Sequence, residues 1–193
     1  MSAPLRSSNG GPGRQKLLGI YLNDHLAGAT AGAGLVHRMV QEHGDSPCGR
    51  ELRALETDVL QDRRALVRLM RDLHAPARRY KVYGAWLGEK LGRVKPNGRL
   101  LRRSGLTLLI ELEAMRMGVT GKALLWRSLL AASPGDPRLD SGRLEELLQR
   151  AERQLEAVDF LHAKAASAQL TPTGPPSSAR EAVAQGTPQR DQG

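Results

Sequence analysis

The sequence has a single cysteine, Cys48, among its 193 residues. An intrachain disulfide and a metal site made of cysteines alone are therefore excluded. No apolar run approaches the roughly 18 residues that a membrane-spanning helix needs. The first residues also lack the charged, apolar and small-residue regions of a signal peptide. We therefore expect a soluble protein in the cytoplasm.

Strand-like alternation of apolar and polar residues is absent as well. Apolar residues instead recur every three or four positions, which is the spacing of an amphipathic helix. The pattern predicts four helices, with expected bounds at 14–43, 50–74, 106–132 and 141–166. Glycine and proline punctuate the ends of the first three helices, as helix stops do. These features predict an all-α, antiparallel four-helix bundle.

The two ends of the chain differ in composition from the rest. Residues 1–13 and 167–193 are rich in Ser, Pro, Gly and Gln and nearly free of large apolar side chains. Such segments bury too little apolar surface to offset the entropy of ordering them, so we expect disordered tails. Residues 14–166 form the expected bundle domain, in which 76–104 are an excursion between the second and third helices. A short basic helix is expected near 78–91.

Positive charge is concentrated in that excursion. Residues 76–104 carry a net charge of +8, whereas the whole chain carries +9. The excursion also holds three of the six aromatic residues. The candidate anion- or partner-binding residues are Arg78, Arg79, Tyr80, Lys81, Tyr83, Trp86, Lys90, Arg99, Arg102 and Arg103.

Four interpretations of the basic residues remain open. Basic side chains interleaved with aromatics can follow phosphates and stack on bases of a nucleic acid. The same pattern suits an anionic membrane surface or an acidic protein partner. Alternatively, the aromatics cover one end of the bundle and the arginines are simply solvated.

A run of small residues in the first helix, within YLNDHLAGATAGAG, leaves one helical face without bulk. Ala27, Gly28, Ala31 and Gly32 are spaced to lie on that face. Because glycine is a poor helix former, its repeated use favours close packing of a neighbouring helix, within the chain or between two chains. A flexible hinge is the alternative.

Histidines and carboxylates at or near the apolar stripes predict a second kind of site. In a helical bundle, such residues from several helices can hold iron, manganese or zinc. The candidate ligands are His25, Asp62, Glu111, Asp159 and His162. The Glu-x-x-His motif of di-iron bundles occurs nowhere in the chain. Hydrogen-bonded packing residues are therefore the alternative interpretation of the two histidines.

Three stretches carry a resemblance to a known family: YLNDHLAGATAG, RRYKVYGAWLGEKLGRVKPNGRLLRRS and LLIELEAMRMGVTGKALLW. Together they resemble a family of uncharacterised actinobacterial helical proteins, and the bundle pattern is similar to the ferritin-like superfold. The resemblance covers residues 14–165 and implies an antiparallel bundle. It implies no activity.

The sequence thus favours a non-enzymatic helical binding or scaffold module without a cofactor. Its basic, aromatic-bearing segment would contact an acidic protein, a nucleic acid or an anionic membrane surface, and a homo-oligomer is left open. The alternative is an atypical ferritin-like metalloprotein with a His/carboxylate site in the bundle core.

Overall fold

The computed structural model describes residues 12–77 and 105–171, and these form four long helices. Helices α1 (Pro12–His43) and α2 (Gly49–Asp72) make one hairpin. Helices α4 (Gly105–Ala132) and α5 (Ser141–Leu170) make the second, joined through the short 3-10 turn η1 (Ser133–Gly135). The described ranges contain no strand, which confirms the all-α, four-helix prediction.

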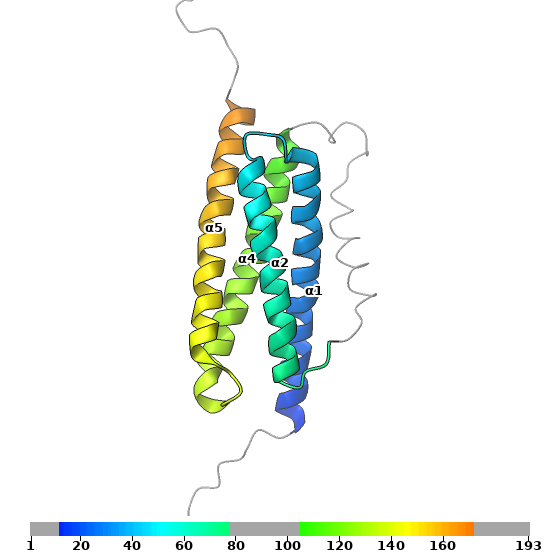
Figure 1. Ribbon diagram of the computed structural model, residues 1–193, viewed down its shortest axis with the longest axis vertical. Coiled ribbons are helices and arrows are strands. Elements are labelled where there is room, and N and C mark those ends of the chain that lie inside the picture. The colour runs from blue at the N-terminus through cyan, green and yellow to red at the C-terminus, as the bar shows by residue number, and fades with distance from the viewer. Residues whose placement is uncertain (1–11, 78–104, 172–193) are drawn as a thin grey trace, which may run out of the picture.

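The helices lie side by side along one axis (Figure 1). Helices α1 and α5 run in one direction, and α2 and α4 run in the other. In addition to the contacts within each hairpin, α1 packs on α4 and α2 packs on α5. Each helix therefore has two neighbours, and all four surround the same interior.

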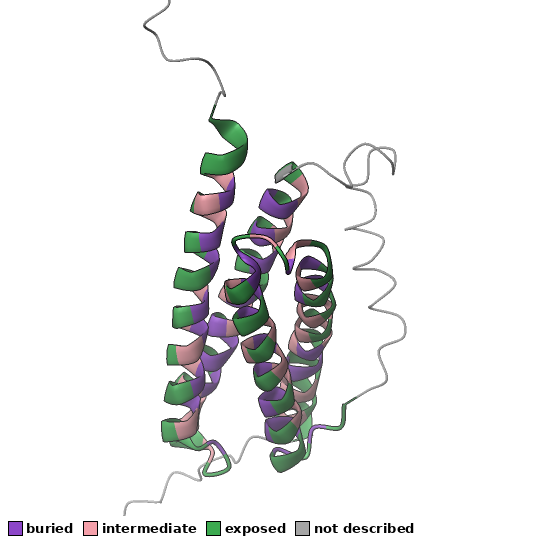
Figure 2. Ribbon diagram, turned by 45° about the horizontal axis from the view of Figure 1, so that its top comes forward, coloured by how far each residue is buried: buried purple, intermediate pink, exposed green. Residues whose placement is uncertain are grey.

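Each helix has buried residues along the side that faces the other helices and exposed residues along the outside (Figure 2). Trp126 is the largest of the fully buried side chains, and Leu22, Met39, Leu52 and Leu144 are among the others. Burying one such side chain contributes about 1.5–3 kcal/mol. The buried face, rather than intrinsic helix propensity, therefore holds the four helices together.

The start of α5 follows from its capping residue. Asp140 has extended backbone dihedrals, and its carboxylate accepts a hydrogen bond from the backbone N–H of Arg143 at 3.1 Å. This bond satisfies one of the N–H groups that a helix start leaves without an intrahelical partner. Asp140 is therefore the N-cap of α5.

The small residues of α1 do not act as the sequence suggested. A Cβ added at Gly28 or Gly32 would have no neighbouring atom within 4 Å, and the same holds for Gly118 and Gly121 on α4. The prediction of close packing within the chain is wrong at these positions, and packing between two chains stays a prediction. Because both facing helices carry glycine there, the space between them is left open as a hollow. Gly49 is the contrasting case, since its added Cβ would lie 1.7 Å from the carbonyl oxygen of Gly44.

Several predictions concern residues outside the described ranges. The predicted basic helix near 78–91 is one of them, and so are most residues of the two predicted tails. Within the described ranges, none of the helices is both long enough and apolar enough to cross a bilayer.

The glycines allow a direct test of this packing. Gly28→Ala is expected to raise the free energy of unfolding by about 0.5–1 kcal/mol, because alanine favours a helix and meets no obstacle there. Gly49→Ala should lower it, because the turn has to move. Urea denaturation of both variants measures the difference. A loss of stability in Gly28→Ala would show that the α1–α4 hollow is closed in solution.

Candidate functional site

The buried polar centre of the bundle is built around Asp62 on α2. Its side chain is 2% exposed. One carboxylate oxygen accepts a hydrogen bond from Nε of Arg150 at 2.6 Å. The other accepts from Nζ of Lys122 at 2.6 Å and from the amide nitrogen of Gln154 at 2.9 Å. Both oxygens are thus bonded to groups that the other hairpin supplies.

Lys122 is the least expected member of this centre, because a lysine is rarely buried unless its charge is paired. Its Nζ donates to Asp62 and also contacts Oε1 of Gln154. Burial lowers the pKa of the Lys122 amine, while the carboxylate of Asp62 opposes that shift. Arg150 lowers the same pKa, and Asp58 raises it. A lysine with a pKa displaced by burial and by specific charged neighbours is a typical feature of functional sites.

A cavity of about 400 Å³ opens next to this centre, between α1, α2 and α4. Glycines and apolar side chains form most of its wall, including Gly28, Gly32, Leu35 and Met115. Asp24, His25, Asp62, Arg63 and Lys122 are the charged or titratable residues among its lining. A mostly apolar cavity with a few polar groups is the usual form of a small-molecule site.

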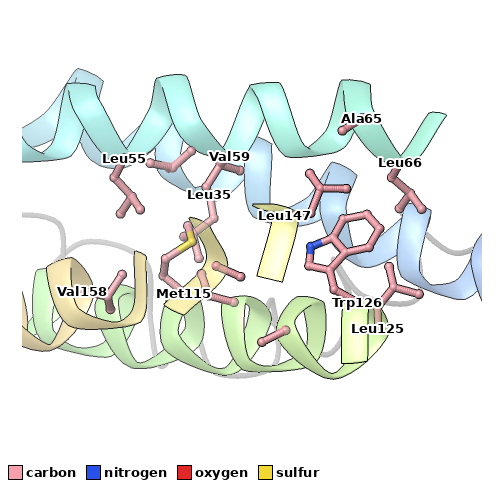
Figure 3. Packing of buried hydrophobic residues seen from close by; sticks show 14 of the residues in the cluster. Leu35, Leu55, Val59, Ala65, Leu66, Met115, Leu125, Trp126, Leu147 and Val158 are labelled. Carbon is pink, nitrogen blue, oxygen red and sulfur yellow. The ribbon is translucent and has the colours of Figure 1, made fainter. Parts of the chain in front are cut away.

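Trp126 lines the same cavity and is 1% exposed. Its indole Nε1 has no hydrogen-bond partner among the described residues. Figure 3 shows the ring of Trp126 among the buried apolar side chains of the core. Its nitrogen is fully buried and therefore does not reach the open space of the cavity. A buried N–H without an acceptor is unusual, because leaving it unpaired costs about 1–3 kcal/mol.

The structure gives the five predicted metal ligands separate surroundings. Asp62 lies in the buried centre, and Asp159 is held by the guanidinium of Arg116 at 2.6 Å. His162 lies 3.3 Å from a carboxylate oxygen of Glu113. His25 packs edge-on against Tyr21, with 4.6 Å between ring centroids, and burial lowers its pKa. Of the predicted ligands, only Glu111 belongs to a metal-compatible group in the described part of the chain.

That group combines Glu111 of α4 with Glu42 and His43 at the end of α1. One ligand atom of each residue lies within 4.8 Å of those of the other two. In the described part of the chain, neither Nε2 of His43 nor Oε2 of Glu111 has a hydrogen-bond partner, and both atoms are buried. Burial raises the pKa of Glu111, and the nearby carboxylate of Glu42 adds to this, while Arg38 opposes it.

The ten predicted anion- or partner-binding residues, from Arg78 to Arg103, lie outside the described residues. The buried centre was only partly found from the sequence, since Asp62 was a candidate and its partners were not. The sequence did, however, contain a signal for the partner Gln154. Gln154 stands between Ala151 and Val158 on the apolar stripe of α5, and a polar residue on such a stripe indicates a buried hydrogen-bond partner.

Comparison with protein-family models, with curated proteins and with solved structures finds no match to this chain. The resemblance to actinobacterial helical proteins and to the ferritin-like superfold gains no support from it. The interpretation of these sites therefore rests on their geometry.

The buried centre gives a stability prediction. Asp62→Ala should lower the free energy of unfolding by about 3–5 kcal/mol, because Lys122 and Arg150 would keep their charges without a buried counter-charge. Asp159→Ala is the matched control, since its ion pair with Arg116 is exposed and should matter far less. Denaturant unfolding of both variants measures the difference. Equal effects would show that Asp62 is not buried in solution.

Proposed function

We propose that this chain is a non-enzymatic helical binding module whose residues 76–104 contact an acidic partner or polyanion. The observation that carries the proposal is the distribution of charge. Those residues have a net charge of +8 in a chain of net charge +9, so the remainder is nearly neutral. A concentration of cations attracts anionic partners and speeds their association.

The arrangement of the helices supports a binding role for this stretch. Helix α2 ends at one end of the bundle, and α4 begins at the other end (Figure 1). The stretch between α2 and α4 therefore connects one end of the bundle to the other. A single long connection between the second and third helices is also the connectivity of ferritin-like bundles, so we extend the proposal to that fold.

The proposal implies binding that depends on salt. Arginine and lysine side chains that neutralise phosphates release condensed counterions, so affinity falls as salt rises. Tyr80, Tyr83 and Trp86 would add sequence-tolerant stacking on single-stranded bases. The three candidate partners, a nucleic acid, an anionic membrane and an acidic protein, are all anionic. They differ in whether stacking of aromatic side chains on bases adds to the affinity.

Charge reversal tests the proposal. Arg99→Glu/Arg102→Glu/Arg103→Glu should weaken binding of a fluorescent single-stranded RNA at least about tenfold, and should reduce the salt slope by about 2, as three lost phosphate contacts predict. Fluorescence anisotropy between low and moderate salt measures both quantities. Anionic vesicles and a polyglutamate peptide are titrated in parallel.

The control carries the same change in net charge on exposed arginines of α2 and α5, Arg64→Glu/Arg68→Glu/Arg153→Glu. It should bind nearly as well as the unaltered chain. Equal losses in the two triple variants, or affinity that is indifferent to salt for all three anions, would contradict the proposal.

A second candidate function is favoured by the group formed by Glu42, His43 and Glu111. An imidazole and two carboxylates are a donor set that suits zinc, manganese or iron and leaves a coordination position open. The C-terminal end of α1, where His43 lies, carries partial negative charge that favours a cation. Two buried, unpartnered ligand atoms are what a metal would satisfy.

Metal binding separates this candidate from the first. His43→Ala and Glu111→Gln should each weaken Zn²⁺ binding by about tenfold or more, because each removes one of three protein ligands. Competition with a chromophoric chelator measures the affinity. The affinity should fall as the pH is lowered, because the ligands then become protonated. His37→Ala on the same helix is the control, because His37 bonds to Glu56 instead. Zn²⁺ affinity that is the same in all three variants would rule out this site.

A further inference from the structure

We propose that two copies of this chain associate through the outer side of α4, with the two α4 helices packed antiparallel. The interaction uses a surface of the bundle itself and does not depend on contact of residues 76–104 with a polyanion. It is carried by the apolar side chains that α4 leaves exposed, by their spacing, and by their fit to a reversed copy of the same helix.

Helix α4 has apolar residues on two sides. One side belongs to the buried core, whereas the other leaves Met117 70% exposed and Leu124 52% exposed, and Leu106 and Ile110 are exposed as well. Only five of the 28 residues of α4 are charged, compared with eleven of the 24 in α2. A helix that is apolar on all sides is normally covered on all sides, so the outer side of α4 is suited to a partner.

The exposed residues of α4 follow a regular spacing. Intervals of four and three residues alternate along the helix, which is how two helices pack along a common line of contact. Large and small residues alternate as well, and none of them is charged. These residues form the outer stripe of α4, which consists of Ile110, Ala114, Met117, Gly121, Leu124 and Ser128.

A reversed copy of α4 fits this stripe. A two-fold axis level with Val119 places every large residue opposite a small one, so that the same patch serves both copies. A Cβ added at Gly121 would have no neighbouring atom within 4 Å, so there is room for a methionine side chain from the partner. The three pairs are Met117 with the partner's Gly121, Leu124 with the partner's Ala114, and Ile110 with the partner's Ser128.

A parallel copy fits less well. At equal levels it would place Met117 against the partner's Met117 and leave a gap between two glycines, which packs poorly. Charge favours the antiparallel arrangement too. Glu113 and Arg127 are exposed and lie on the same flank of the stripe, since both bond to α5. In the reversed pair Glu113 comes close to the partner's Arg127, and opposite charges beside a helix seam stabilise that orientation.

Ser128 is the polar member of the outer stripe, and it does not oppose burial. Its Oγ accepts a hydrogen bond from the hydroxyl of Tyr21 at 3.2 Å. A buried hydroxyl costs little when it keeps such a partner. Tyr21 also continues the apolar surface onto α1, where Leu17 and Ile20 are exposed.

The first test measures self-association of the full-length protein by analytical ultracentrifugation, from low micromolar to submillimolar concentration. We expect a reversible dimer. Met117→Glu/Leu124→Glu should raise its dissociation constant at least about a hundredfold, because each substitution buries a carboxylate that has no counter-charge.

The matched control is Phe160→Glu/Leu170→Glu, which places the same charges at exposed apolar residues of α5. This variant should dimerise like the unaltered chain. A monomer at every concentration would overturn the proposal, and so would equal losses in the two double variants.

The second test determines the orientation by disulfide formation in a Cys48→Ala background. Ala114→Cys mixed with Leu124→Cys should give a disulfide-linked heterodimer under mild oxidation. Leu124→Cys alone should not, because the reversed pair separates the two copies of this residue by about 15 Å along the axis, beyond the reach of a disulfide. Efficient cross-linking of Leu124→Cys to itself, or none in the mixture, would overturn the antiparallel pairing.

A third measurement separates this interface from the basic residues. Arg99→Glu/Arg102→Glu/Arg103→Glu should dimerise like the unaltered chain even where it has lost RNA. High salt should leave the apolar dimer intact, whereas it weakens binding to a polyanion. Loss of the dimer in the triple variant would place the contact on residues 76–104 instead and overturn the proposal.

Discussion

The burial of one carboxylate, that of Asp62, constrains the rest of the bundle. A buried charge costs several kcal/mol unless it is paired and hydrogen-bonded. The partners of Asp62 come from α4 and α5, whereas Asp62 itself belongs to α2. The two hairpins must therefore pack at the one register that brings these side chains together.

The same pairing decides where other chemistry can occur. Because both oxygens of Asp62 are bonded to groups of α4 and α5, the middle of the bundle holds cations where a metalloprotein would hold a metal. The metal-compatible group lies instead where the end of α1 meets α4. Lys122 also lines the adjoining cavity.

The sequence by itself determined the helices and their ends. The three-or-four spacing of apolar residues and the glycines and prolines at helix ends are local signals, and the helices they predicted agree with the structure to within a few residues. Local sequence could not determine what the glycines of α1 face, because that depends on α4 presenting glycines at the same level. It also could not show that Asp62 meets Lys122, 60 positions away. Helix formation depends on near neighbours along the chain, whereas cavities and buried ion pairs depend on distant residues that only tertiary packing brings together.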